Sequence, residues 1–171
     1  PIIISIMNLS LPVISAIIER QHNGQTEILV QTRWKLEKDP VYSGTLEIPA
    51  GHIEAYENVY QTIKREVLEE TGLKIVNIKP DIKTKIYSPN NDGAFAFVPF
   101  CCQQQLKGGK PWIGFVFICE VEDKKPRPNP KEVKDIHWIT KSELKNILDS
   151  TPEKIFALQL GVLDYYLNYH D

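Results

Sequence analysis

The stretch that decides the fold is residues 51–73, which read GHIEAYENVYQTIKREVLEETGL. Asn58 is a residue type that caps helix N-termini, and Gly72 is the type that ends helices in a left-handed conformation. Between these two residues, apolar side chains recur every three or four positions, as they do on the buried face of a helix. The stretch therefore predicts one amphipathic helix that begins after Asn58 and ends at Gly72.

Three carboxylates share one face of this predicted helix. Glu66, Glu69 and Glu70 stand at positions i, i+3 and i+4, where like charges destabilise a helix by a few tenths of a kcal/mol per pair. A chain that accepts this repulsion has a reason to place a cation there, and oxygen ligands suit Mg²⁺ or Mn²⁺ better than Zn²⁺. Arg65 can pair with Glu69 or reach back to Glu57. Taken alone, the three carboxylates also fit an ordinary solvated helix face.

The spacing of the whole stretch resembles the signature of the Nudix hydrolase family: G, five residues, E, seven residues, then R-E-apolar-x-E-E-x-G-apolar. Its fixed positions fall, without a gap, on Gly51, Glu57, Arg65, Glu66, Val67, Glu69, Glu70, Gly72 and Leu73. The resemblance implies metal-dependent hydrolysis of a pyrophosphate bond in a nucleoside diphosphate linked to another group. It also implies an α+β fold, the Nudix α/β/α sandwich with a mixed sheet. Some domains of this fold bind nucleotides without cleaving them. A non-catalytic nucleotide-binding module is therefore the alternative to an enzyme.

The resemblance also implies roles for individual residues. Glu66, Glu69 and Glu70 would hold Mg²⁺, or Mn²⁺ in its place, together with the backbone carbonyl of Gly51. Glu54, in the loop before the helix, is a possible further ligand. Arg65 would brace the loop, and Glu57 would be an outer ligand or would orient Arg65.

The general base is open, because members of the family use either a helix glutamate or one on a later loop. The later candidates here are Glu120, Glu122 and Glu132, and Glu132 is preferred because it follows a proline-rich loop; an exposed surface charge explains it equally well. Tyr56 stands where many relatives have glycine, which tolerates positive φ. We therefore expect the loop around Glu57 to differ in shape.

Two short segments point towards ADP-ribose or another nucleotide-sugar as the substrate. Pro49-Ala50-Gly51 resembles the entry of that subgroup, and Ser88-Pro89 follows at a similar spacing, although Ser-Pro is also an ordinary turn signal. Nucleoside triphosphates, including oxidised dGTP, and dinucleoside polyphosphates are the alternatives. The residues predicted to contact the substrate are Arg33, Trp34, Pro89 and Phe97, although core packing or a solvated strand end explains several of them equally well.

The composition fits one domain over residues 1–171, with a core at about 13–148 and a C-terminal helix at about 152–168. Of the 171 residues, 42% are hydrophobic and 25% charged, and the net charge is -2, which exerts no overall pull on nucleic acid or membranes. The three cysteines, Cys101, Cys102 and Cys119, lie in apolar runs and predict buried, reduced thiols in a cytoplasmic protein. Residues 1–18 carry no charged side chain and predict two buried strands rather than a membrane span. The same segment could instead form the interface of a homodimer.

Strands and helices are expected in mixed order. Val13–Ile18 and Glu27–Thr32 predict a hairpin around Asn23-Gly24. Further strands are predicted at Leu46–Ile48, Ile75–Ile78, Ile82–Tyr87, Phe95–Leu106, Pro111–Val121 and Ile136–Ile139. Thr140 and Glu143 predict a capping box that opens a helix to about Leu148, and Pro152 predicts the first turn of the last helix.

Overall fold

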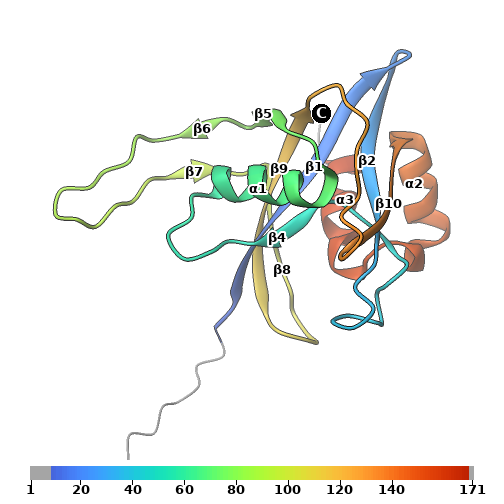
Figure 1. Ribbon diagram of the computed structural model, residues 1–171, viewed down its shortest axis with the longest axis horizontal. Coiled ribbons are helices and arrows are strands. Elements are labelled where there is room, and N and C mark those ends of the chain that lie inside the picture. The colour runs from blue at the N-terminus through green and yellow to red at the C-terminus, as the bar shows by residue number, and fades with distance from the viewer. Residues whose placement is uncertain (1–8, 170–171) are drawn as a thin grey trace, which may run out of the picture.

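The computed structural model describes residues 9–169, which form a mixed sheet between two layers of helices (Figure 1). The strands are β1 Leu11–His22, β2 Gln25–Arg33, β3 Leu46–Glu47, β4 Ala50–His52, β5 Ile75–Lys79, β6 Ile82–Lys83, β7 Phe97–Val98, β8 Cys101–Gln104, β9 Trp112–Val121 and β10 Val133–Thr140. The helices are α1 Val59–Thr71, α2 Lys141–Ser150 and α3 Leu160–Asn168.

The main sheet has the strand order β10-β2-β1-β9-β5, with β3 on β2, β4 on β1 and β8 on β9. β1 and β9 run parallel, whereas the other pairs run antiparallel. β2 pairs with the end of β1, and β4 pairs with its beginning. The carboxylate helix α1 follows β4 directly, so this part of the sheet positions the candidate site.

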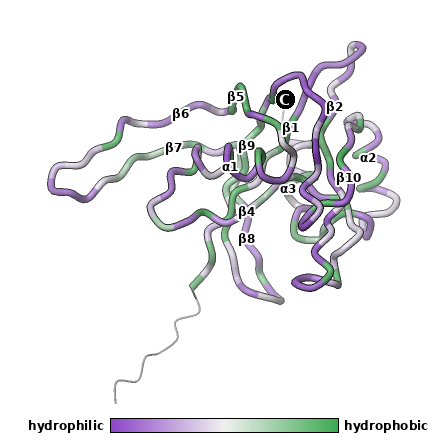
Figure 2. The backbone as a smooth tube through the Cα atoms, viewed as in Figure 1, coloured by the Kyte–Doolittle hydropathy of each residue, from purple (hydrophilic) through white to green (hydrophobic). Residues whose placement is uncertain are grey.

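The two faces of the sheet carry separate hydrophobic cores. Because side chains alternate along a strand, Ile17 of β1 packs with α2 and α3, whereas its neighbour Ile18 packs with α1. Hydrophobic residues accordingly gather along the central strands, as Figure 2 shows. The predicted α+β fold, with the carboxylate helix on one face and the C-terminal helices on the other, is confirmed.

Two local predictions are confirmed by their backbone geometry. Asn23 and Gly24 both have positive φ, 49° and 74°, and join β1 to β2 with His22 opposite Gln25. Left-handed φ at both central residues belongs to the tight turns that match strand twist. At α2, the Thr140 Oγ1 accepts from the Glu143 N–H, and the Glu143 Oε2 accepts from the Thr140 N–H.

Two predicted strands are wrong in extent. Of Ile82–Tyr87, only Ile82–Lys83 form a strand, and Tyr87 makes a single bridge. Phe95–Leu106 is not one strand, because Pro99 interrupts it: β7 pairs with β6, and β8 pairs with β9. Proline lacks the N–H that a continuous ladder requires.

The C-terminal helix does not begin at Pro152. Short 3-10 turns at Pro152–Lys154 and Ala157–Gln159 precede α3, which starts at Leu160. Between the two turns, Ile155 bridges to Leu46, and the Phe156 N–H donates to the Leu46 carbonyl at 2.7 Å. This contact with β3 keeps the chain extended where a helix was expected.

The cysteines were also only partly predicted. Cys119 is buried, Cys101 is half-buried and Cys102 is exposed, because adjacent residues of β8 point to opposite sides. The part of the first predicted strands that falls within residues 1–8 lies outside the described residues. Within residues 9–169, no helix is long and apolar enough to cross a membrane.

Candidate active site on the carboxylate helix

Helix α1 begins and ends where the sequence places its caps. The Asn58 Oδ1 accepts from the Tyr60 N–H at 2.9 Å, and the Gln61 Oε1 accepts from the Asn58 N–H at 3.1 Å. Gly72 has φ 70°, and its N–H donates to the Leu68 carbonyl. These caps satisfy backbone groups at both helix ends and hold the register of the carboxylates between them.

The Glu66 carboxyl group lies against β4, in space that a side chain on Gly51 would fill. A Cβ placed on Gly51 would be 2.0 Å from the Glu66 Cδ. The Glu66 side chain is 13% exposed, and burial raises its pKa, although the pair with Arg65 opposes that rise. Gly51 and Glu66, both predicted ligands, are therefore in direct contact.

Arg65 ties the loop to the helix. Its Nε and Nη2 donate to the two Glu57 oxygens, each at 2.8 Å, and Nη2 also donates to the His52 carbonyl at 3.1 Å. Its Nη1 donates to the Glu66 Oε1 at 2.5 Å. The hydrogen bonds from Arg65 lower the pKa of Glu57 to about 2. Of the two roles predicted for Glu57, orienting Arg65 is the one that these contacts support.

Glu70 and Glu69 lie in very different surroundings. Glu70 is 2% exposed and accepts from the Gln31 Nε2 at 2.8 Å and the Ala50 N–H at 3.3 Å. Burial, followed by the Glu47 charge, raises the pKa of Glu70 to about 8. The Glu69 side chain is 56% exposed, and its one ion-pair partner in the described part of the chain is Arg65, at the long distance of 3.4 Å. The face of three carboxylates thus has one buried, one nearly buried and one accessible member.

Gln31 and Glu47 complete the buried part of the site, and the sequence analysis assigned a role to neither. Glu47 is 3% exposed, and it accepts from the Gln31 Nε2 at 3.2 Å and the Arg33 Nη1 at 2.8 Å. The strand alternation carried a usable signal: Leu29, Gln31 and Arg33 share one face of β2, and Leu29 packs with α1. A polar residue on that face needs a buried partner.

Lys35 and Glu132 bring the proline-rich loop to the same place. The Lys35 Nζ lies 2.9 Å from the Glu132 Oε2, and the Trp34 N–H donates to the Glu132 carbonyl at 2.8 Å. Burial raises the pKa of Glu132, but the pair with Lys35 and the charges of Lys38 and Arg33 together outweigh it, and the pKa lies below its ordinary value. The Glu132 charge contributes to the raised pKa of Glu66, so the two carboxylates are close enough to interact.

Within residues 9–169, no hydrogen bond or ion pair joins the remaining predicted residues to Glu66, Glu69 or Glu70. Glu54 is exposed in the loop, where its N–H donates to Glu57, and Pro89 is exposed in the segment between β6 and β7. Phe97 packs in an aromatic cluster with Tyr60, Phe95, Phe115 and Phe117.

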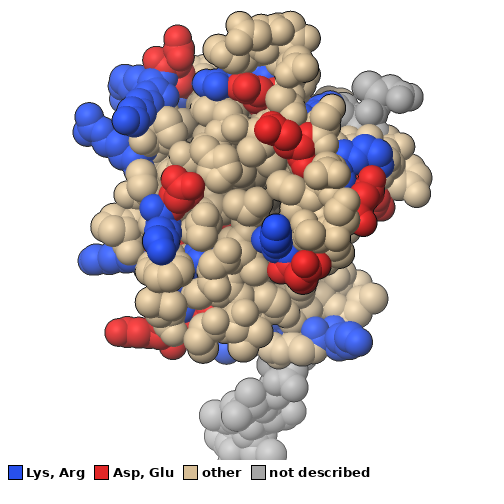
Figure 3. Space-filling view, turned by 90° about the vertical axis from the view of Figure 1, so that its right-hand side faces the viewer, with Lys and Arg blue, Asp and Glu red and all other residues tan. Residues whose placement is uncertain are grey.

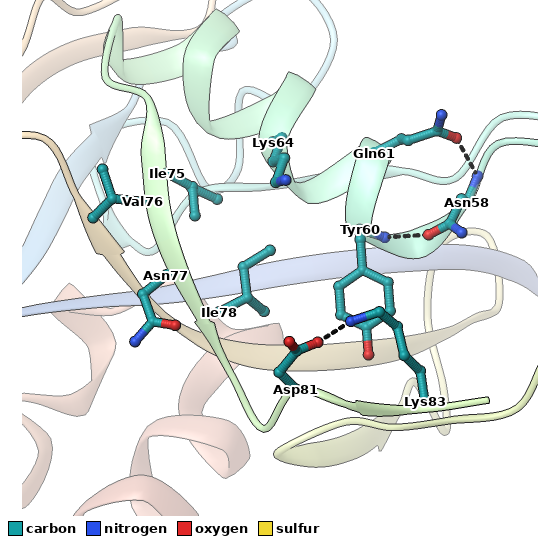
Figure 4. Close-up of a pocket in the computed structure, with 10 residues that line it drawn as sticks. All are labelled: Asn58, Tyr60, Gln61, Lys64, Ile75, Val76, Asn77, Ile78, Asp81 and Lys83. Atoms are coloured by element: carbon teal, nitrogen blue, oxygen red, sulfur yellow. Dashed lines mark hydrogen bonds and ion pairs between the residues drawn. The ribbon is translucent and has the colours of Figure 1, made fainter. Parts of the chain in front are cut away.

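A cavity of about 390 Å³ beside this cluster lies between α1 and β5 (Figure 4). None of the three carboxylates Glu66, Glu69 and Glu70 lines it. Its lining includes Tyr60 and Lys64, which point to the other side of α1 from Glu66 and Glu69, given the 100° turn per residue.

The loop around Tyr56 was expected to differ because tyrosine disfavours positive φ. Tyr56 nevertheless has φ 63° and is fully exposed. Tyrosine adopts here the left-handed conformation that glycine favours, and Glu57 still reaches Arg65, so the role of Glu57 does not require a glycine at this position. A difference in loop shape from relatives stays a prediction.

The family model of the NUDIX domain matches residues 10–159, most of the chain. The chain belongs to the Nudix family. It is a hydrolase of that family, which acts on nucleoside diphosphate derivatives. No curated protein matches this Nudix chain.

Solved structures show the same fold at low sequence identity. MutT protein from Methanosarcina mazei is 18% identical, with a TM-score of 0.63 and 94% of each chain covered. The NUDIX domain of Shewanella oneidensis NrtR, complexed with ADP ribose, is 14% identical, with a TM-score of 0.58 over 81% of this chain and 77% of that one. A C. elegans Ap4A hydrolase is 16% identical, with a TM-score of 0.58 over 84% and 90%.

Nudix hydrolases generally use divalent metal ions, and the residues present fit one. The donors are carboxylates and a backbone carbonyl, which hard cations prefer. Beside them, the Gln31 Oε1 is buried and has no hydrogen-bond partner within residues 9–169, so it can accept a further bond. In the arrangement described, no three acidic, thiol or imidazole groups of these residues converge on one point. Glu66 is turned to Arg65, and Glu70 to Gln31.

Proposed function

We propose that this Nudix hydrolase cleaves the pyrophosphate bond of ADP-ribose or a related nucleotide-sugar with Mg²⁺, which Mn²⁺ can replace. The observation that carries the proposal is the contact of Gly51 with Glu66 beside the buried Glu70, because three of the predicted ligands lie next to one another where β4 meets α1. The fold shared with an ADP ribose-bound NUDIX domain supports this substrate class. The fold shared with an Ap4A hydrolase keeps dinucleoside polyphosphates as the second candidate.

Each residue of the site has a proposed part. Glu66, Glu69, Glu70 and the Gly51 carbonyl would hold the metal, which would supply neutralisation of phosphate charge and activation of water. Glu57 orients Arg65, and Arg65 keeps β4 against α1. Glu132, on the loop facing these carboxylates, accepts the proton of the attacking water. Arg33 and Trp34 lie beside Glu132 and are candidates to contact the substrate, whereas Glu54, Pro89 and Phe97 stay predictions.

The binding partners and the location of the enzyme are also proposals. We infer a small-molecule nucleotide substrate rather than long nucleic acid, in accordance with the net charge of -2. On the face in Figure 3, basic and acidic side chains are interspersed, with no continuous basic stripe on that face. A cytoplasmic location, a single domain and a homodimer remain proposals.

The experiment is a hydrolysis panel in Mg²⁺ and in EDTA, with ADP-ribose, other nucleotide-sugars, dinucleoside polyphosphates, and normal and oxidised nucleoside triphosphates. AMP release from ADP-ribose in Mg²⁺ only is the expected result. Preference for a triphosphate, with pyrophosphate released, would replace the substrate and keep the metal mechanism. Absence of turnover on every compound would favour a nucleotide-binding module instead.

A further inference from the structure

Lys35 differs from the other basic residues of the site. Arg33 and Arg65 each donate to two or more carboxylates through several guanidinium nitrogens. The Lys35 ammonium has one ion-pair partner within residues 9–169, the Glu132 Oε2 at 2.9 Å. An ammonium carries three donors, so Lys35 has donors to spare.

The backbones on both sides of this ion pair are fixed. The Lys35 N–H donates to the Ser43 Oγ at 3.0 Å, and the Lys35 carbonyl accepts from the Asp39 N–H at 2.7 Å. On the other side, the Glu132 N–H donates to the Asn129 carbonyl at 3.0 Å. The side chains of Lys35 and Glu132 can therefore separate while these backbone hydrogen bonds stay in place.

The Lys35 ammonium is close enough to the proposed metal ligand Glu70 for their charges to interact. The Lys35 side chain is 19% exposed. The loop that carries its partner Glu132 is bound to α1, since the Asn129 N–H donates to the Glu70 carbonyl at 3.2 Å. Burial has the largest effect on the pKa of Glu70 and raises it, whereas Gln31 and Lys35 are among the groups that lower it. Glu132, the partner of Lys35, acts in turn on Glu66. The Lys35 charge thus interacts with Glu70 on α1 and with Glu132 on the proline-rich loop.

We propose that Lys35 is the resident counter-ion of this site and its phosphate-binding residue. Without metal, Lys35 holds Glu132 and supplies positive charge to the carboxylates. When a divalent cation binds, it repels Lys35, which turns to a phosphate oxygen of the substrate and leaves Glu132 free. Lysine suits this exchange because it is a point charge on a flexible stem. The proposal rests on the proposed metal-dependent function.

Two effects follow when the Lys35 charge is removed. A divalent cation is no longer repelled by a nearby ammonium, so the protein should bind the cation more tightly. A pyrophosphate group on the metal-loaded protein loses one positive partner, so it should bind more weakly. A residue that only supports the fold would not change these two affinities in opposite directions.

The test compares wild type, Lys35→Met, Lys35→Arg and Lys145→Met. Lys145 pairs with Asp149 at 3.2 Å on the exposed side of α2, so Lys145→Met removes a Lys–carboxylate pair elsewhere. Titration calorimetry measures Mn²⁺ binding to metal-free protein. It then measures binding of imidodiphosphate, a pyrophosphate analogue that resists hydrolysis, to the Mn²⁺-loaded protein. Circular dichroism checks that each variant is folded.

We expect Lys35→Met to bind Mn²⁺ about threefold or more tightly and imidodiphosphate about fivefold or more weakly, in accordance with one nearby charge in a polar medium. Lys35→Arg and Lys145→Met should stay within about twofold of wild type in both measurements. Unchanged or weaker Mn²⁺ binding by Lys35→Met would overturn the counter-ion role, and unchanged imidodiphosphate binding would overturn the phosphate role. A wild type that binds no Mn²⁺ would instead contradict the proposed function itself.

Discussion

Gly51 and Glu66 share a volume that admits only a glycine. A Cβ on Gly51 would lie 2.0 Å from the Glu66 Cδ and 2.2 Å from its Oε2, far inside any van der Waals contact. The backbone of Gly51 is not in the left-handed region, so what requires glycine is the approach of the carboxylate and not φ. The contact joins β4 to α1 where the metal is proposed to bind.

Gly51→Ala should therefore leave the chain folded and displace the Glu66 carboxylate. The obstructing atoms are the end of a flexible side chain, so we expect a loss of stability of about 1 kcal/mol or less. Mn²⁺ affinity should fall about tenfold or more, because a proposed ligand has moved. Calorimetry of Mn²⁺ binding and urea unfolding measure the two effects.

Gly161→Ala is the matched control for that substitution. Nothing lies within 4 Å of a Cβ on Gly161, which is in α3, so alanine should stabilise the helix by up to about 1 kcal/mol without changing Mn²⁺ affinity. Unchanged Mn²⁺ binding by Gly51→Ala would show that Glu66 does not need its observed position.

Tyr56→Gly should stabilise the protein. Tyr56 has φ 63°, a conformation that costs an L-residue about 1–2 kcal/mol, and its exposed ring contributes little packing. Glycine removes that cost but loses more backbone entropy on folding, so the expected net gain is up to about 1 kcal/mol in urea unfolding. Tyr56→Ala keeps a Cβ and should gain nothing, and equal gains for both variants would refute strain as the cause.

Glu47→Gln should destabilise the fold more than loss of an ordinary surface pair. Arg33 would keep Asp39 but lose its buried partner at 2.8 Å, and we expect a cost of about 1–3 kcal/mol. Glu27→Gln, which breaks the more exposed Arg20 pair, should cost about 1 kcal/mol or less. Urea unfolding in the absence of metal compares them, and equal costs would contradict the importance of burial.

Metal binding should release a proton from Glu70 at neutral pH. Burial and then the Glu47 charge raise the pKa of Glu70 to about 8, so most metal-free molecules carry that proton at pH 7, whereas a bound metal requires the carboxylate. Calorimetry with Mg²⁺ in buffers of different ionisation enthalpy should find about one proton released at pH 7 and almost none at pH 9. Glu70→Gln should abolish the release, and release that persists in that variant would assign the proton to another group.

The same raised pKa affects stability without metal. The folded chain keeps a proton on Glu70 that the unfolded chain loses near pH 4.5. The stabilisation is complete below pH 4.5 and is lost as pH rises through about 8, since the folded state binds more protons in that interval. Urea unfolding measures this effect. From pH 4.5 to 8, the free energy of unfolding of wild type should fall relative to that of Glu70→Gln, which has no ionisable group at this position.

The sequence was most informative where local chemistry decides the structure. The caps at Asn58 and Gly72, the turn at Asn23-Gly24 and the Thr140 capping box depend on neighbours within a few residues, and all are confirmed. The fold class followed from the spacing of one motif and from the mixed order of the elements.

The sequence was least informative where distant contacts decide the structure. Ile155 and Phe156 are extended because Leu46 binds them, and nothing near Pro152 indicates that partner. Glu47 and Gln31 belong to the site only because β2, β3 and α1 meet there. The different burial of Glu69 and Glu70 likewise depends on the strands that cover only one of them.

The most direct test of the central claim, metal-dependent hydrolysis by the α1 carboxylates, is the initial rate of AMP release from ADP-ribose in Mg²⁺. The rates of wild type, Glu69→Gln, Glu70→Gln and the exposed control Glu153→Gln are compared, with EDTA samples alongside. The account predicts that both helix variants lose about a hundredfold or more while remaining folded, that Glu153→Gln matches wild type, and that EDTA abolishes every rate. Rates within twofold of wild type for both helix variants, or full activity in EDTA, would contradict it.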